Sequence, residues 1–283
     1  CRSLAMPRTL NGLREIAGIY EAILLDQFGV LHDGRRAFPE APAAVRALRD
    51  AGARIAVVSN SGKPAATNRA RLQALGFSPD LFDGVLSSGE LGRHRLKDWL
   101  DDGTLPAGAG VSVIASDTDR SLIDGLDLCE VSDPDATRLL LLAGAAPDTG
   151  ADPCIARALT GLASRGVPAL CVNPDRWIYA DGGVADGPGT LAQRYAAMGG
   201  DVTWIGKPQP EIFRSARATL NLAESAATLV IGDSPEHDVS GARNAGYPCL
   251  FVTGGIYAEA AAAADGHLNA NVSSEFVIPT FRW

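Results

Sequence analysis

Short runs of apolar residues alternate along this chain with longer stretches in which apolar residues recur every three or four positions. Runs of the first kind predict buried β-strands, and stretches of the second kind predict amphipathic helices. Six strands are expected from such runs, at 22–26, 54–59, 85–88, 203–207, 228–233 and 248–253. Regular alternation of strands with helices is typical of a parallel α/β sheet, which is the fold class we expect.

The expected helices lie between these strands. Val45 and Leu48 are one helical turn apart before a glycine, as are Leu72 and Leu75, and both pairs predict a helix that ends at that glycine. The same apolar stripe recurs over 212–220, and the alanine run at 260–264 is also expected to be helical.

Residues 104–187 differ in character from the sequence on either side. They contain strands of their own at 111–115, 139–143 and 169–172, and a helix near 155–163. Segments rich in Gly and Pro border them at 105–108 and 186–189, and such segments commonly mark domain boundaries. We therefore expect a core domain formed by 1–103 and 188–283, with 104–187 as an inserted α/β domain.

The composition narrows the range of partners. The 283 residues are 46% hydrophobic and 20% charged, with a formal net charge of −8 and a pI near 5.0. An acidic chain is poorly suited to nucleic acid, which is bound by a basic face, so no nucleic-acid partner is expected. A small phosphorylated substrate remains compatible, because a bound metal can invert the charge of one site.

Cysteine usage and the apolar runs bear on location. Five cysteines without C-x-x-C spacing fit a reducing compartment, and a cytoplasmic location is expected. The first twenty residues contain no apolar run suited to a signal peptide. The strongest apolar run, 139–146, is too short to span a bilayer, so no membrane partner is expected.

Reactive residue types fall at the ends of the expected strands. Asp26 ends the first strand, Ser59 and Asn60 the second, Lys207 the fourth and Asp233 the fifth. Parallel strands end at one edge of a sheet, where ligands bind. Two carboxylates can hold a hard cation such as Mg²⁺, while the lysine offsets phosphate charge and the Ser and Asn donors fix its oxygens. The set suits phosphoryl transfer.

Four segments give this pattern a family resemblance. They are LDQFGVL at 25–31, VSNS at 58–61, GKPQP at 206–210 and GDSPEHD at 232–238, and NPD at 173–175 is similar to a cap-loop motif. In this order they resemble the haloacid-dehalogenase superfamily, class IIA, typified by NagD-like sugar phosphatases. The resemblance implies a Rossmann-like parallel-sheet core with an inserted α/β cap of the C2 type that chooses the substrate.

Carried over to this sequence, the resemblance implies a role for each motif residue. Asp26 would attack phosphorus and form an aspartyl-phosphate. Mg²⁺ would be bound by Asp26, by Asp233 and by the backbone carbonyl of Phe28, with Asp238 nearby or bound through water. The substrate would be a small phosphate monoester.

The remaining motif residues would act on the substrate itself. Ser59 would hold the phosphoryl group, and Lys207 would neutralise it. Asn60, Asn173 and Asp175 are expected to bind substrate. A homodimer through the cap is left open. Asp238 also has a second interpretation, as the N-cap of the helix that follows it.

One position departs from the family pattern. Phosphatases of this family carry a second aspartate two residues after the nucleophile, which protonates the leaving oxygen and then activates water. Here that position is Phe28, which has no exchangeable proton. Loss of general acid–base catalysis typically costs about 10²- to 10⁴-fold in rate. His32 and Asp33 follow closely and are the first candidates to replace it.

Phe28 therefore keeps two other functions open. One is hydrolysis restricted to acyl or aryl phosphates, whose leaving groups need no proton. The other is a sensor or scaffold that binds phosphate and metal without turnover. Dehalogenation is disfavoured because Asp233 indicates a metal site, and a dinucleotide-dependent dehydrogenase is disfavoured because no G-x-G-x-x-G follows the first strand.

Overall fold

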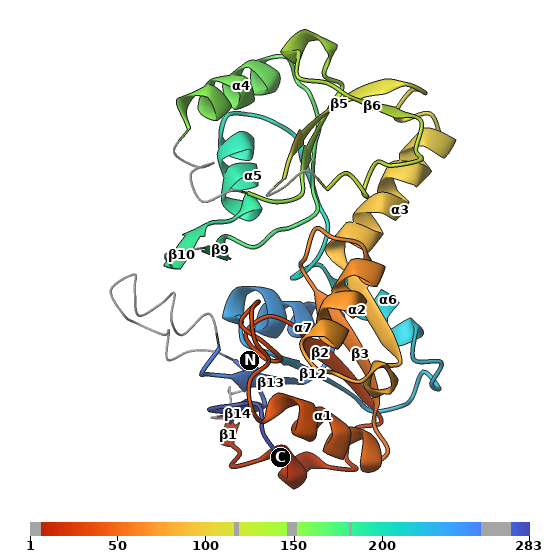
Figure 1. The fold of residues 1–283 in the computed structure, drawn as a ribbon, viewed down its shortest axis with the longest axis vertical. Helices are drawn as coiled ribbons and strands as arrows, with labels where there is room; N and C mark the ends of the chain where they lie inside the picture. Colours follow the sequence, from red (N-terminus) through yellow and green to blue (C-terminus); the bar gives the residue numbers. More distant parts are fainter. Residues whose placement is uncertain (1–6, 116–118, 146–151, 181–182, 256–272) are drawn as a thin grey trace, which may run out of the picture. The chain divides into compact units, whose positions relative to one another are not determined.

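The computed structural model describes residues 7–115, 119–145, 152–180, 183–255 and 273–283. The chain forms two compact units (Figure 1). Unit 1 consists of residues 1–59, 66–86 and 207–283, and unit 2 consists of residues 60–65 and 87–206. Unit 2 is thus inserted into the sequence of unit 1.

Unit 1 is built on a seven-stranded sheet with the strand order β1-β14-β13-β12-β2-β3-β4. Its pairings from β1 to β3 are all parallel. Every residue of the interior strand β2 is buried, as expected for a parallel strand covered on both faces. In chain order the strands are β1 (Arg8–Thr9), β2 (Ala22–Asp26), β3 (Arg54–Ser59), β4 (Gly84–Ser87), β12 (Thr228–Gly232), β13 (Cys249–Val252) and β14 (Phe276–Ile278).

The helices of unit 1 form because their apolar residues share one face. In α1 (Ala41–Asp50), for example, the residues at 41, 44, 45 and 48 are buried, which follows the helical period. The other helices are α2 (Ala65–Ala74), α6 (Pro210–Ala218) and α7 (Ser240–Ala245), with short 3₁₀ turns at Leu13–Ile16 and Pro79–Leu81 and one π-helical turn at Pro235–Val239.

Unit 2 contains a five-stranded parallel sheet with the order β11-β8-β7-β5-β6. An antiparallel hairpin of β9 and β10 accompanies it. The strands are β5 (Ala109–Ile114), β6 (Leu128–Glu130), β7 (Leu139–Leu142), β8 (Ala169–Cys171), β9 (Trp177–Ala180), β10 (Gly183–Asp186) and β11 (Val202–Trp204). The helices are α3 (Ser88–Asp101), α4 (Pro153–Ser164) and α5 (Pro188–Ala197), with a 3₁₀ turn at Pro134–Ala136.

Strand β7 shows how the sheet of unit 2 is covered on both faces. Leu139 and Leu141 belong to one buried cluster, whereas Leu140 and Leu142 belong to another. Successive side chains of a strand point to opposite faces, so the run of four leucines supplies two cores at once. This explains why the sequence here is continuously apolar instead of alternating.

The α/β class with a parallel-sheet core is confirmed, but two sequence expectations differ from the structure. The strand expected at 203–207 falls within the expected core domain, whereas the strand observed there, β11, pairs with β8 in the sheet of unit 2. That pairing, together with α5 packing on β7 and β8, groups residues 188–206 with unit 2. Helix α3 also belongs to unit 2. The alanine run at 260–264 lies outside the described residues.

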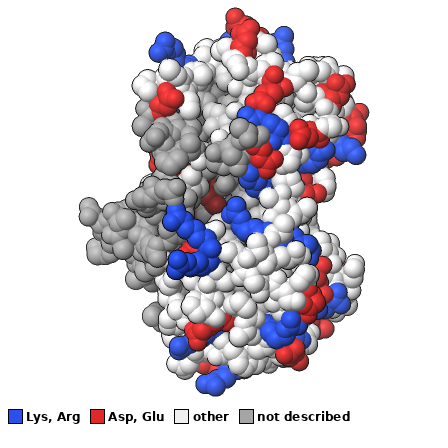
Figure 2. All heavy atoms as spheres, viewed as in Figure 1, with Lys and Arg blue, Asp and Glu red and all other residues white. Residues whose placement is uncertain are grey.

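The surface carries both signs of charge. Groups of Lys and Arg side chains and groups of Asp and Glu side chains are both seen in Figure 2, with broad areas of other residues between them. Within the described residues, no helix combines the length and the apolar character needed to cross a lipid bilayer.

Candidate active site

Three neighbouring strands of unit 1 bring polar residues to one sheet edge. Asp26 is the last residue of β2 and pairs in register with Val58, so Ser59 follows at the same edge. On the other side of β2, Leu25 pairs with Ile231, so that Asp233 follows the end of β12. Strand register thus delivers two aspartates and a serine together, as the strand-end argument expects.

Lys207 forms the centre of a buried charge cluster. Its Nζ donates to Oδ1 of Asp26 at 2.5 Å and to Oδ1 of Asp238 at 2.7 Å. The lysine is only 3% exposed, Asp26 is 6% exposed and Asp238 is 1% exposed. Residues far apart in the sequence therefore share two charge-assisted hydrogen bonds that are largely shielded from water.

Asp233 completes the cluster. Ligand atoms of Asp26, Asp233 and Asp238 all lie within 4.8 Å of one another. A Cβ on Gly29 would lie 2.1 Å from Oδ2 of Asp233, and a Cβ on Gly255 would lie 2.2 Å from the same atom. Gly29 also has a φ of +85°. Glycine is required at both positions, because the backbone after β2 and the backbone after β13 both approach the Asp233 carboxylate too closely for any side chain.

The electrostatics of the cluster are unbalanced. Burial raises the pKa of the Asp26 carboxyl well above its usual value, and the charges of Asp238 and Asp233 raise it further, whereas the Lys207 ammonium lowers it. If all three carboxylates are ionised, they exceed the single Lys207 ammonium by two negative charges. Oxygen ligands with excess negative charge are the donor set that hard divalent cations prefer, so these residues fit Mg²⁺.

The π-helical turn after Asp233 positions both Asp238 and Lys207. Oδ2 of Asp238 accepts from the backbone N–H of Ser234 at 3.1 Å. The cap of this turn is Ser234, whose hydroxyl accepts from the N–H of His237. The next helix, α7, has Val239 at its N-cap and no side-chain cap bond, so the interpretation of Asp238 as its N-cap is wrong. Nδ1 of His237 donates to the carbonyl oxygen of Lys207 at 3.2 Å. Sequence reasoning missed this support, although His237 directly precedes Asp238.

Phe28, the residue that departs from the family pattern, packs against His32. The two rings meet edge to face with centroids 4.5 Å apart. Nδ1 of His32 accepts from the N–H of Gly34 at 2.8 Å, so the neutral ring carries its proton on Nε2. Nε2 of His32 lies 3.0 Å from the side-chain amide nitrogen of Gln27. The amide oxygen of Gln27, Oε1, is buried and has no hydrogen-bond partner among the described residues. Exchanging the two ends of the Gln27 amide pairs Nε2–H with Oε1.

Neither expected substitute for the missing acid is suited to donate a proton. His32 is fully buried, and burial lowers its pKa to about 4, so the ring is neutral at pH 7. Oδ1 of Asp33 accepts from the N–H groups of Arg35 and Arg36 at 2.8 and 2.7 Å. These backbone bonds, that of Arg36 first, lower the pKa of Asp33. Both side chains shape the loop after Asp26.

The three residues expected to bind substrate lie in unit 2, where they bond to one another and to their own loop. Nδ2 of Asn60 donates to Oδ1 of Asp175 at 2.8 Å, and Oδ1 of Asn60 accepts from the hydroxyl of Ser88 at 3.2 Å. Oδ1 of Asn173 accepts from the N–H of Asp175 at 3.2 Å. Asn60 is thereby fixed directly after Ser59, which is buried.

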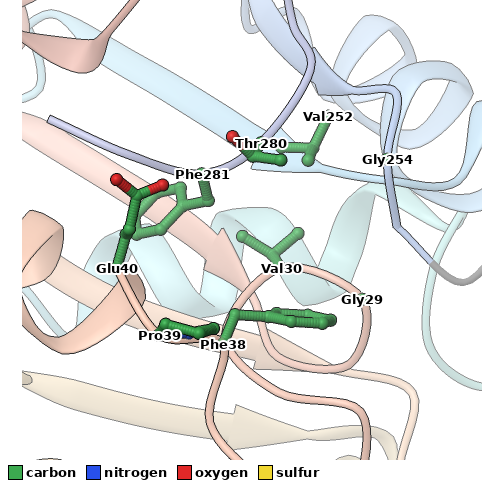
Figure 3. A pocket seen from close by; sticks show the side chains of 9 residues that line it. All are labelled: Gly29, Val30, Phe38, Pro39, Glu40, Val252, Gly254, Thr280 and Phe281. Atoms are coloured by element: carbon green, nitrogen blue, oxygen red, sulfur yellow. The ribbon is translucent and has the colours of Figure 1, made fainter.

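A cavity of about 280 Å³ in unit 1 adjoins the loop after Asp26 (Figure 3). Gly29 and Val30 of that loop line it together with Phe38, Val252 and Phe281. None of the three clustered aspartates lines this cavity, and its walls are mainly apolar, so it does not suit a phosphate group.

Comparison with known proteins identifies relatives that match along most of the chain. Two family profiles match: haloacid dehalogenase-like hydrolase over residues 23–129, and HAD-hydrolase-like over residues 204–282. Chronophin from Homo sapiens is 30% identical over 267 residues, covering 86% of this chain and 84% of chronophin.

Two solved structures resemble this chain over most of its length. A haloacid dehalogenase-like hydrolase from Brucella suis 1330 matches with a TM-score of 0.83 and 27% identity, covering 96% of this chain and 99% of that protein. Glycerol phosphate phosphatase from Mycobacterium tuberculosis, solved in complex with calcium, matches with a TM-score of 0.63 and 25% identity, covering 85% of this chain and 68% of that one.

Proposed function

We propose that this chain, which belongs to the haloacid dehalogenase-like hydrolase family, hydrolyses small phosphate monoesters in a Mg²⁺-dependent reaction through Asp26. The resemblance to the NagD-like class that its motifs indicated is confirmed by the family profiles and the relatives. The activity of its relatives supports the reaction class, since glycerol phosphate phosphatase is among them.

The buried cluster of three carboxylates around one lysine is the observation that carries the proposal. Three buried carboxylates whose oxygen atoms lie within 4.8 Å of one another repel each other, and a divalent cation bound among them would offset that repulsion. Asp26, Asp233 and Asp238 fit that cation, and the backbone carbonyl of Phe28, two residues beyond Asp26, is proposed as an additional ligand. Binding of calcium by the Mycobacterium tuberculosis relative supports a divalent ion.

Each residue then has a proposed task. The carboxylate of Asp26 attacks phosphorus, the bond to the leaving oxygen breaks, and water later hydrolyses the aspartyl-phosphate. Mg²⁺, when bound, neutralises charge on the phosphoryl oxygens. Lys207 adds a second positive charge beside Asp26, and Ser59 donates a hydrogen bond to the phosphoryl group.

Unit 2 is proposed to be the cap that selects the substrate. Asn60, Asn173 and Asp175 are its proposed contacts, and their bonds to one another keep this loop ordered before substrate arrives. The cap domain was expected at 104–187; the same role is proposed here for unit 2 with its wider boundaries.

Phe28 favours a second, narrower function. With no proton donor at position 28, and with His32 and Asp33 engaged elsewhere, departure of an alkoxide is slow. Acyl and aryl phosphates avoid this step because their leaving groups depart as anions. Restriction to such substrates is therefore the alternative that the loop geometry supports.

One experiment tests the proposal. A panel of alkyl, sugar, aryl and acyl phosphates is assayed for phosphate release with Mg²⁺ and with EDTA, using Asp26→Asn as the control. We expect Mg²⁺-dependent release that Asp26→Asn abolishes. Release that is unaffected by EDTA, or that persists in Asp26→Asn, would remove Asp26 and the metal from the reaction.

A further inference from the structure

Phe28 is the base of a small assembly on unit 1. Its ring is held by the edge of His32 on one side, and a Cβ on Gly34 would lie 3.4 Å from Cε1 of the ring. The chain also bridges Phe28 to His32 and His32 to Ala37, which closes the loop around the ring. The ring is therefore fixed in place two residues after the nucleophile.

Arg71 covers the ring. Its guanidinium carbon lies 5.6 Å from the centroid of Phe28, a cation–π arrangement. Arg71 belongs to α2 and is exposed. Within the described residues no carboxylate forms an ion pair with it. An arginine held on an aromatic face loses little freedom when it binds an anion, because its planar group is already oriented.

The charged groups near Phe28 include arginines. The groups that shift the pKa of Asp26 are Lys207, Asp238 and Asp233, whereas Arg71 acts on His32. Arg35 and Arg36, both exposed, lie on the same loop. The ring of Phe28 thus has one arginine over it, and its loop carries two more, in a chain whose net charge is −8.

Resting on the proposed function, we propose that Arg71, stacked on Phe28, is a specificity-determining residue that recognises a second anionic group on the leaving-group side of the substrate. The substrate class is then a phosphate monoester whose alcohol carries a carboxylate or a further phosphate. A guanidinium binds either anion with two parallel hydrogen bonds. Arg71 lies over the side chain at position 28, which is the position of the proton donor in the family pattern, so recognition of charge would accompany loss of the acid.

A pair of matched ligands isolates this contact. 3-Carboxypropyl phosphate and 4-hydroxybutyl phosphate have similar primary alcohols, but only the first has a second anionic group. Their affinities are measured by calorimetry with Mg²⁺ on the Asp26→Asn protein, which keeps binding apart from turnover. We expect the carboxylated ligand to bind about 10- to 100-fold more tightly, the range for a charge-assisted hydrogen bond.

Variants of two arginines on α2 test whether Arg71 causes this preference. Arg71→Ala should reduce the preference to below about twofold and Arg71→Lys should keep part of it, since the charge remains without the planar fork. Arg69→Ala is the matched control, because residues two apart on a helix face different sides, and it should keep the full preference. An unchanged preference in Arg71→Ala, equal weakening of both ligands, or no preference in the parent protein would overturn the assignment.

The same ligands keep the two proposals distinguishable. If the wild-type chain with intact Asp26 hydrolyses no phosphate monoester but the binding preference follows Arg71, the proposed reaction fails and the recognition role stands. If hydrolysis is Mg²⁺-dependent and indifferent to Arg71 for both ligands, the reaction stands and the recognition role fails.

Discussion

Replacing Lys207 with methionine tests the buried charge cluster directly. Methionine has a similar length and no charge, so the change removes two hydrogen bonds, to Asp26 at 2.5 Å and to Asp238 at 2.7 Å, with little loss of volume. At these distances and an effective dielectric constant of about 20, each contact is worth about 6 kcal/mol of Coulomb attraction. Desolvation of the ammonium offsets much of this. Breaking a buried ion pair by removing one partner typically costs a net ~3–5 kcal/mol.

The loss should depend on pH in a defined direction. The pKa of Asp26 is already raised by burial, and Lys207 lowers it, so Lys207→Met raises it further. A carboxyl whose pKa is raised by folding contributes stability below its unfolded pKa, and that contribution is lost as the pH rises through the folded pKa. The variant should therefore be destabilised more at pH 8 than at pH 5.

Hydrogen exchange measures the loss of stability in unit 1 separately from unit 2. Amides of β2 and β12 report the free energy of opening of the sheet that holds the cluster. In EDTA, a loss of ~3–5 kcal/mol makes their exchange roughly 10²- to 10⁴-fold faster. Lys97→Met, at an exposed lysine of α3, is the matched control and should leave exchange unchanged. Equal exchange in Lys207→Met and wild type, or a larger effect at pH 5 than at pH 8, would refute the reasoning.

Three further predictions concern other members of the site. Asp233→Asn should weaken Mg²⁺ binding by more than about 10-fold in calorimetry, and an unchanged affinity would remove Asp233 from the metal site. Burial lowers the pKa of His32 from 6.5 to about 4, so its neutral ring should contribute stability that is lost as the pH falls through this interval, by up to about 3 kcal/mol. A His32→Gln variant whose unfolding has the same pH dependence as that of the wild type would contradict this. Phe28→Asp should raise hydrolysis of alkyl phosphates by up to ~10²- to 10⁴-fold, while Phe28→Leu should not, and equal rates in the two variants would show that no proton donor is missing.

The sequence predicts strand ends correctly where the pattern lies within the strand itself. The apolar runs of β2 and β3 are continuous and bounded by turn residues, and the structure ends β2 at Asp26 and β3 at Ser59, as expected from the runs. Because these strands are parallel neighbours, placing their ends also placed their reactive residues. The position of Asp233 could be predicted for the same reason, since Asp233 directly follows β12.

Where the sequence failed, the deciding contacts were between distant segments. The run at 203–207 has the composition of a strand, but only pairing with β8 assigns β11 to unit 2, and composition does not reveal a pairing partner. Lys207 reaches Asp26 nonetheless, because the chain re-enters unit 1 at that residue. The stacking of Arg71 on Phe28 joins a helix to a loop 43 positions earlier and leaves no periodic signal in either.

The covalent intermediate at Asp26 is the most direct test of the proposed reaction. Wild-type protein is mixed with Mg²⁺ and a radiolabelled aryl phosphate, quenched with acid within milliseconds, digested and mapped by mass spectrometry. Phosphate should be found on the peptide that contains Asp26, at a level that rises and falls with turnover, and Asp26→Asn should show none. Phosphate release from the wild type with no labelled Asp26 at any time, or with the label on another residue, would contradict the account.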